Sequence, residues 1–236
     1  MVNNRTNIIR TLLYPASCIL CGAPGAGDLD ICAGCRRELP VNRLCCSRCA
    51  VPIAAAAEPG TICGKCLVRP PKFDLCIAPY RYQAPIDSLI TGFKFQQKLS
   101  NGRLLSLLLL DFLKRSAPVW PEIIIPVPLH RKRVTERGFN QALELARPIS
   151  RHFSLPLELS SCIRKHPTAP QMNLEQSSRQ QNIKGAFEIR GSIGFRHVAL
   201  LDDVVTTGAT ASELAALLKK QGVERVDVWA LARTPC

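Results

Sequence analysis

The pattern of apolar and polar positions after residue 85 predicts helices alternating with buried strands. Apolar residues at helical spacing predict helices over four segments, 86–93, 104–113, 140–150 and 211–221. Short apolar runs bounded by proline, glycine or charged residues predict strands over four others, 122–127, 186–189, 198–201 and 225–231. Strands that are apolar throughout and alternate with helices are typical of a parallel sheet covered on both faces. We therefore expect an α/β fold with a parallel sheet flanked by helices.

Two segments do not follow this pattern. Residues 165–184 are polar and almost without periodicity, which predicts a long mobile loop. The first 70 residues are rich in cysteine and end at the proline pair Pro70 and Pro71. We therefore expect a small metal-binding domain over residues 1–72 and the α/β domain over residues 73–236.

Cysteine spacing defines the first domain. Ten of the 12 cysteines lie in the first 76 residues, and eight of them form four Cys-x-x-Cys pairs. A two-residue gap lets both sulfurs reach one tetrahedral ion, so four pairs predict two structural Zn²⁺ sites. The predicted ligands are Cys18, Cys21, Cys32, Cys35, Cys46, Cys49, Cys63 and Cys66. Redox or iron–sulfur use is the alternative, and the spacing does not decide between sequential and interleaved pairing of the four motifs.

The sequence also predicts the cellular compartment of the protein and the charge of its ligands. Residues 10–18 resemble a secretion signal ending in cysteine, but the apolar part is short and contains Pro15, and Cys18 belongs to the first cysteine pair. No apolar run is long enough to cross a bilayer, so we expect a cytoplasmic protein with no membrane span. The formal net charge is +13, which favours anionic ligands such as phosphates or nucleic acid.

The most informative segment begins with the apolar run Val198 to Leu201, continues with Asp202 and Asp203, and ends with the short loop Thr206 to Thr210. In open α/β sheets, ligands bind at the carboxyl ends of the strands. Backbone N–H groups at a helix start form a phosphate cradle, and Gly208 lets the backbone approach closely. Carboxylates beside such a cradle point to a sugar phosphate, and capping of a turn by the two acids is the simpler alternative.

This segment resembles the phosphoribosyl-pyrophosphate signature of type I phosphoribosyltransferases. The resemblance implies that Asp202 and Asp203 hold the ribose hydroxyls, directly or through Mg²⁺, and are the candidate catalytic residues. It implies that the following loop binds the sugar phosphate through Thr206, Thr207, Gly208, Ala209 and Thr210.

A second resemblance covers nearly the whole chain. The run from Pro126 to Arg133 followed by Arg137 to Ala142, the order of residues in the polar loop and the four cysteine pairs are together similar to the ComF family of competence proteins. The resemblance implies that the loop after the strand ending at Ile125 binds pyrophosphate. The basic residues there are Arg131, Lys132, Arg133 and Arg137, which suit that group, although a solvated basic face is the alternative.

Other residues near the expected site carry weaker signals. On the polar loop, Gln171, Arg179 and Asn182 are expected to belong to a lid over the reacting sugar. Lys94, next to an apolar helical stripe, is a minor candidate for a ligand contact, and His130 is expected to be an ordinary turn histidine.

Three functions agree with these features. The first is phosphoribosyl transfer to an acceptor that the sequence does not identify. The second is a non-catalytic role in transformation, with single-stranded DNA and other competence proteins as partners, in which charge carries the binding because aromatic residues make up only 6% of the chain. The third is a phosphoribosyl pyrophosphate sensor.

Overall fold

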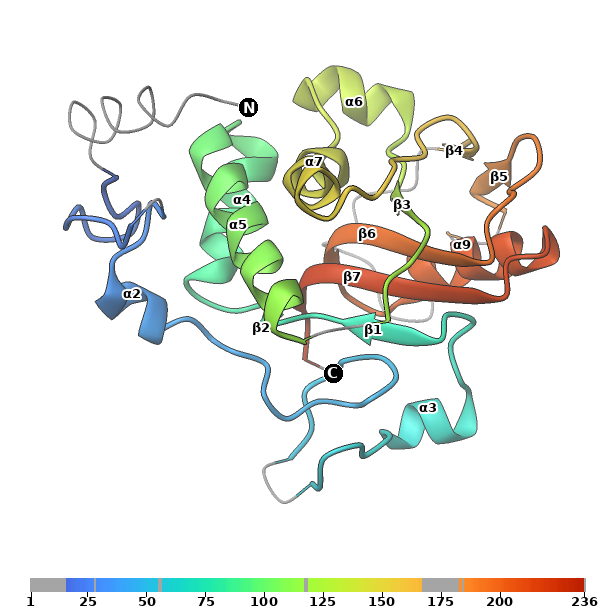
Figure 1. The fold of residues 1–236 in the computed structure, drawn as a ribbon, viewed down its shortest axis with the longest axis horizontal. Coiled ribbons are helices and arrows are strands. Elements are labelled where there is room, and N and C mark those ends of the chain that lie inside the picture. Colours follow the sequence, from blue (N-terminus) through green and yellow to red (C-terminus); the bar gives the residue numbers. More distant parts are fainter. Residues whose placement is uncertain are drawn as a thin grey trace.

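The computed structural model describes residues 16–27, 29–54, 57–116, 119–166, 183 and 185–235. Within the cysteine-rich part it contains two short helices, α2 (Ala33–Arg37) and α3 (Gly64–Val68), joined by turns and isolated bridges. Each helix begins directly after the first cysteine of a pair, with Cys32 and Cys63 at the N-cap positions. The rest of the chain forms the predicted α/β body (Figure 1).

A parallel sheet forms the centre of the body. Its strands are β1 (Leu75–Ile77), β2 (Tyr80–Arg81), β3 (Ile123–Pro126), β6 (His197–Val205) and β7 (Arg225–Arg233). The order is β1-β7-β6-β3, and β2 pairs with β7 beyond the end of β1. All of these pairings are parallel. The two central strands, β6 and β7, are mostly buried, in agreement with their largely apolar sequence.

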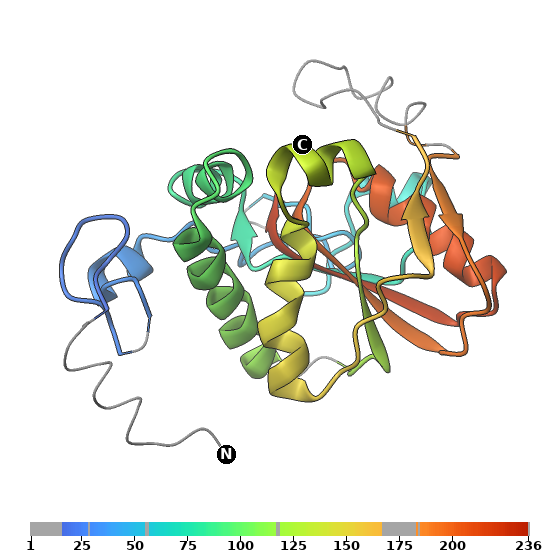
Figure 2. The same ribbon diagram turned by 90° about the horizontal axis from the view of Figure 1, so that it is seen from above.

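Helices cover both faces of this sheet. The helices α4 (Ile86–Phe95), α5 (Leu99–Ser116) and α7 (Gln141–Phe153) lie on one side, and α9 (Ala209–Lys220) lies on the other (Figure 2). Gly102 allows α5 to approach α4 closely, since a Cβ at this position would lie 2.4 Å from the ring of Phe93. This contact fixes the end of α4 that carries Lys94.

Three further elements stand near the carboxyl ends of the strands. The short helix α6 (Arg131–Arg137) follows β3. The strands β4 (Cys162–Arg164) and β5 (Phe187–Ile189) form a separate antiparallel pair. Between β4 and β5 runs most of the polar segment that we expected to be a mobile loop, and its residues 167–182 and 184 lie outside the described part of the chain.

Most predicted elements are confirmed, with two differences. The strand expected over 198–201 extends to Val205, so both acidic residues lie within β6 instead of following it. The basic run after β3 forms the helix α6, whereas we expected a loop there. The strands β1, β2 and β4, of two or three residues each, were not predicted, whereas the equally short β5 was.

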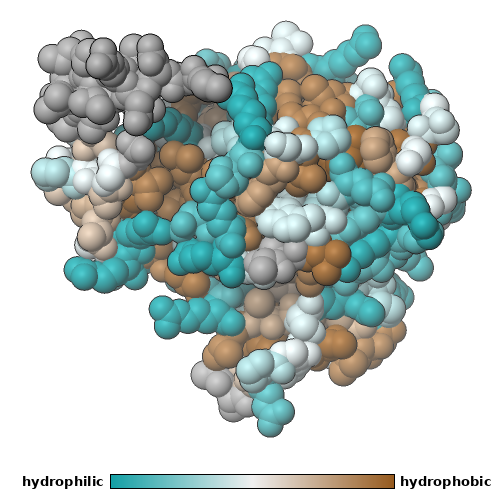
Figure 3. Space-filling model, in the orientation of Figure 1, coloured by the Kyte–Doolittle hydropathy of each residue, from teal (hydrophilic) through white to brown (hydrophobic). Residues whose placement is uncertain are grey.

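Within the described residues, none of the helices is long and apolar enough to cross a membrane. On the face seen in Figure 3, apolar side chains gather in several separate patches among hydrophilic ones.

Candidate functional site

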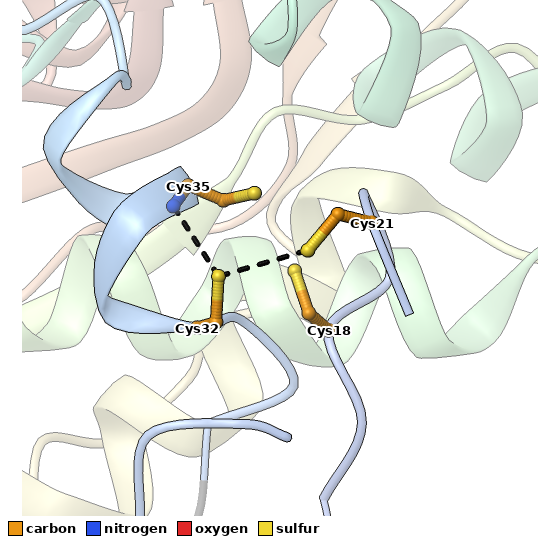
Figure 4. A group of neighbouring side chains, drawn as sticks. All are labelled: Cys18, Cys21, Cys32 and Cys35. Carbon is orange, nitrogen blue, oxygen red and sulfur yellow. Dashed lines mark hydrogen bonds between the residues drawn. The ribbon is translucent and has the colours of Figure 1, made fainter. Parts of the chain in front are cut away.

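The eight paired cysteines form two separate four-cysteine clusters. The first cysteine site contains Cys18, Cys21, Cys32 and Cys35, and the second contains Cys46, Cys49, Cys63 and Cys66. Within each site all sulfur atoms lie within 4.8 Å of one another. Figure 4 shows the four side chains of the first site pointing toward a common centre. The structure therefore selects sequential pairing of the motifs, which the sequence left open.

The geometry of both sites fits a tetrahedral zinc ion. Zinc–sulfur bonds of about 2.3 Å place the corners of a tetrahedron about 3.8 Å apart. The sulfurs of Cys21 and Cys32 are 3.7 Å apart, and those of Cys49 and Cys63 are 3.8 Å apart. Four sulfur ligands with no open position are typical of a structural site.

Backbone amides favour the metal-binding thiolate form at one or two cysteines of each site, while the pKa of several other thiols is raised, in Cys49 mainly by burial. Burial alone raises the pKa of Cys18, but amide groups of Cys32, Cys21 and Leu20 outweigh this effect and lower the pKa to about 6. In the second site, burial is likewise outweighed at Cys46, where amides such as that of Cys63 lower the pKa to about 7.

The two sites differ in exposure. In the first site Cys21 is exposed, and a cavity of about 490 Å³ opens beside it, lined also by Arg37 and Pro85. In the second site three of the four cysteines are buried. The first site is therefore open to solvent on one side, whereas the second is enclosed by the fold.

The acid pair, Asp202 and Asp203, lies near the carboxyl end of β6. The two carboxyl groups interact with each other and with Lys94, but they differ in exposure. Asp203 is only 6% exposed, and its Oδ2 lies 2.7 Å from Nζ of Lys94 on α4. Asp202 is less buried, and its Oδ1 accepts a hydrogen bond from the amide of Asp203 at 2.8 Å. Lys94 thus contacts the acid pair, while no lysine among the described residues forms an ion pair with Asp202.

Burial raises the pKa of Asp202 to about 7, the negative charge of Asp203 adds to the rise, and the positive charge of Lys94 opposes it. Carboxylate oxygens are the ligands that Mg²⁺ prefers, and it is usually held by one or two of them together with substrate phosphates. Because Lys94 already pairs with Asp203, the side chain that fits such an ion best is Asp202.

The segment of residues 206–210, named the 206–210 loop, follows β6 and includes Ala209 and Thr210 at the start of α9. Gly208 has a φ of +79° and is the N-cap of α9, where it adds no side chain in front of the first turn. The first turn carries no acidic residue, and its amides give the helix start a partial positive charge. The ring of Phe73 lies 3.7 Å from where a Cβ of Gly208 would be, so the loop rests on a buried aromatic side chain. This is the local geometry of an anion site.

The helix α6 divides the predicted basic cluster. Arg131 and Lys132 are exposed, whereas Arg133 and Arg137, one turn apart, are partly buried. Arg137 interacts electrostatically with Asp203, stacks on Phe95 at 5.0 Å and donates to Gln141 at 3.0 Å. Of these four residues, Arg137 therefore interacts with the acid pair, and Arg133 interacts with Arg137. His130 caps α6 by accepting from the amide of Lys132, in agreement with its expected role as a turn residue.

Arg164 on β4 also belongs to these surroundings. It interacts electrostatically with Asp202 and with Arg133, and its guanidinium lies 5.3 Å from the centre of the Phe187 ring. In the sequence, Arg164 is marked only by the order of residues in the polar loop that resembles the ComF family. The strand that positions it is three residues long and therefore shows no period.

The three residues predicted to form a lid, Gln171, Arg179 and Asn182, lie outside the described residues. The described end of the segment is anchored near the candidate site, because the amide of Gly185 donates to Oε1 of Glu213 on α9 at 3.0 Å.

Comparison with known families divides the chain as the structure does. Residues 9–67 match the model of the double zinc ribbon domain, and residues 140–236 match that of the phosphoribosyl transferase domain. The first match covers both cysteine sites, and the second covers the acid pair and the 206–210 loop.

Several curated proteins are similar over most of the chain. The "DNA utilization protein YhgH" of Shigella flexneri is 36% identical over 228 residues, 94% of this chain and 99% of the relative. The "Competence protein F" of Haemophilus influenzae is 37% identical over 86% of this chain and 90% of its own length. The "Competence protein ComFC" of Bacillus subtilis is 25% identical over 83% and 80%, respectively. With its double zinc ribbon and its phosphoribosyltransferase-like body, the chain belongs to the ComF family of competence proteins.

Proposed function

We propose that the protein binds phosphoribosyl pyrophosphate together with Mg²⁺. One observation carries the proposal: the acid pair of β6 leads directly into the 206–210 loop at the start of α9, and basic side chains from α4, α6 and β4 surround the acids. This arrangement supplies acceptors for sugar hydroxyls, amides for a phosphate and cations for a diphosphate within one site.

In this proposal each part of the ligand has a matching group. The ribose hydroxyls donate to the carboxylate of Asp202 and, at the edge of the ion pair with Lys94, to Asp203. The sugar phosphate accepts from the amides and hydroxyls of the 206–210 loop. The pyrophosphate lies toward Arg133 and Arg137, and bound Mg²⁺ neutralises part of its charge.

Calorimetry with phosphoribosyl pyrophosphate and Mg²⁺ tests this binding. We expect Asp202→Asn/Asp203→Asn to lower the affinity at least about tenfold, since hydrogen bonds to charged groups are worth about 1.5–3 kcal/mol each. The matched control is Asp87→Asn, a partly exposed acid of α4 whose side chain bonds only to Ser88 in the described structure. Equal affinities of the wild type and the double variant would contradict the proposal.

The same site suits transfer of the phosphoribosyl group. A nucleophile forms a bond to C1 of the ribose, the bond from C1 to the pyrophosphate oxygen breaks, and pyrophosphate leaves with the bonding electrons. Pyrophosphate release is therefore measured with a panel of bases and nucleic acids, in the wild type and in the double Asp variant. Release that needs an acceptor and the acid pair supports a transferase. Binding without release supports a sensor.

A second candidate function is the handling of single-stranded DNA, and the pair Arg131 and Lys132 favours it, because both residues are exposed and accessible to a phosphate backbone. The names of the relatives refer to DNA utilization and competence. In this proposal the protein acts in the cytoplasm during transformation, with incoming DNA and other competence proteins as partners.

Fluorescence anisotropy with a labelled oligonucleotide at several salt concentrations tests the second function. Each lost phosphate contact reduces the slope of log affinity against log salt by about 0.7 for single strands. We expect this reduction in Arg131→Gln/Lys132→Gln and not in Lys114→Gln/Lys220→Gln, which removes two exposed charges from α5 and α9. An affinity of the wild type that does not depend on salt would exclude the function.

A further inference from the structure

The second cysteine site is joined to the body through consecutive backbone carbonyls. The carbonyl of Arg48 accepts from the amide of Cys76 in β1 at 2.9 Å. The carbonyl of Cys49 accepts from Nε of Arg233 at 2.9 Å, and that of Ala50 accepts from Nδ2 of Asn42 at 2.8 Å. The turn that carries Cys46 and Cys49 is thus fixed against the sheet.

Arg233, the last residue of β7, connects this turn to the 206–210 loop. It is only 3% exposed. While Nε donates to Cys49, Nη1 donates to the carbonyl of Val205 at 3.0 Å and to that of Thr206. Val205 ends β6, and Thr206 is the first residue of the loop. One buried guanidinium therefore bonds to a cysteine of the second site and to the start of the loop.

The buried positive charge of Arg233 is a second reason to connect this residue with the second cysteine site. Among the described residues, no carboxylate forms an ion pair with this guanidinium, which would be costly for an isolated buried charge. Four thiolates around one Zn²⁺ carry a net charge of −2, so a loaded second site supplies the missing negative charge next to Cys49.

We infer that Arg233 is a positioning residue that couples the second cysteine site to the 206–210 loop. Metal in this site holds the Cys49 carbonyl, Arg233 aligns on that carbonyl, and its Nη1 orders the backbone that leads into the loop. Coupling between two sites is reciprocal, so a ligand on the loop stabilises the metal in the second site. The ligand part of this inference rests on the proposed function, whereas the coupling itself does not.

The first cysteine site provides a contrast within the same chain. Its ties to the body go to α5, where Arg36 pairs with Asp111 at 2.6 Å and Asp30 with Arg103 at 2.8 Å. These pairs are partly exposed and lie on a different element from the 206–210 loop. Loss of this site should therefore leave the loop unchanged.

Hydrogen exchange of the full-length, ligand-free protein tests the coupling. Cys66→Ser disables the second site without touching the residues bonded to Arg233, and Cys35→Ser is the matched change in the first site. We expect amides in residues 202–210 to exchange about fivefold faster or more in Cys66→Ser, the effect of losing one hydrogen bond, and at the wild-type rate in Cys35→Ser.

Faster exchange in residues 104–113 of α5 would show that Cys66→Ser loosens the whole fold. In that case a second variant, Arg233→Lys, tests the coupling. Arg233→Lys keeps all eight thiols and the positive charge. Its single ammonium group cannot bond to the carbonyl of Cys49 and to the carbonyls of Val205 and Thr206 at the same time. We expect faster exchange at 202–210 with two zinc ions still bound. Unchanged exchange there in Arg233→Lys would overturn the inference.

The effect of the ligand on the second site is measured in Cys35→Ser. This variant binds zinc only in the second site, so the zinc that it releases comes from that site alone. We expect saturating phosphoribosyl pyrophosphate with Mg²⁺ to slow the release of this zinc to a chelator about fivefold or more, and we expect Arg233→Lys in the same background to abolish the effect. If calorimetry shows no binding, the proposed function fails, while hydrogen exchange still decides the coupling. Binding without any change in zinc release would overturn the reciprocal link.

Discussion

Lys94 and Asp203 form the ion pair that distinguishes the two acids of β6. The side chains are 20% and 9% exposed, so the pair lies where water screens it weakly. Removing one partner of such a pair leaves an uncompensated charge, which costs more than the pair gains. The pair therefore determines both the stability of this region and the charge that a ligand meets.

Replacing Lys94 with Met tests the role of this pair. We expect Lys94→Met to lower the free energy of unfolding by about 2 kcal/mol, because Asp203 loses its cation while remaining almost buried. Lys94→Met/Asp203→Asn should recover most of the loss, since no charge is then unpaired. Denaturant unfolding measures both values. A single variant as stable as the wild type would show that water, and not Lys94, compensates Asp203.

Asp202 predicts a pH dependence of ligand binding. Burial raises its pKa to about 7, so the folded, ligand-free protein holds this proton up to neutral pH. The proposed ligand requires the ionised carboxylate, and its affinity should therefore rise with pH, by about tenfold from pH 6 to pH 8. The charges that set this pKa are those of Asp203, Lys94 and Arg164.

Calorimetry at several pH values measures this rise. The phosphates of the ligand also titrate in this range, so the comparison with Asp202→Asn isolates the contribution of the protein. In that variant we expect only the shallower dependence of the ligand itself. The same slope in the wild type and the variant would assign the pH dependence to the phosphates alone.

Elements with a long apolar pattern were predictable from the sequence, whereas several of the short ones were not. The strands β6 and β7 and the helices α4, α5, α7 and α9 follow their expected positions because burial imposes a period on many residues. The helix α6 has no buried residue and therefore no such period. Its helical form comes from caps, His130 at the start and Gly138 with a φ of +80° at the end.

The candidate site has its clearest sequence signal where one segment carries it, whereas Lys94 was only a minor candidate. The acid pair and the 206–210 loop are consecutive in the sequence, and their residue types indicate the chemistry. Lys94, Arg164 and Arg233 come from three other elements and reach the same region through the sheet order and the packing of α4. Sequence spacing does not contain such long-range contacts.

The connection from β6 to α9 depends on Gly208. Its φ of +79° is a conformation that residues with a Cβ adopt with strain. We expect Gly208→Ala to lower the free energy of unfolding by about 1 kcal/mol and to weaken ligand binding, because the amides of the loop would shift. The control is Gly194→Ala, at a position with a negative φ and open space around it. Equal stability of the two variants would mean that the loop tolerates a Cβ.

At the scale of the molecule, the two cysteine sites are integrated to different degrees. The first site is tied to α5 by partly exposed ion pairs, and the second is bonded to β1 and to the end of β7. Repeated Cys-x-x-Cys motifs look equivalent in the sequence, and only the packing distinguishes them. The domain boundary near residue 72 stays a prediction.

This difference predicts that a chelator removes the two zinc ions in separate phases. A metal leaves when its surroundings open locally, and opening costs less where few buried contacts must break. The first site has the exposed Cys21 and the adjoining cavity, so we expect its zinc to leave about tenfold faster or more than that of the second site. A chromogenic chelator follows the release over time. Cys66→Ser should retain only the fast phase and Cys35→Ser only the slow one, whereas one common rate for both variants would show that exposure does not control zinc release in this protein.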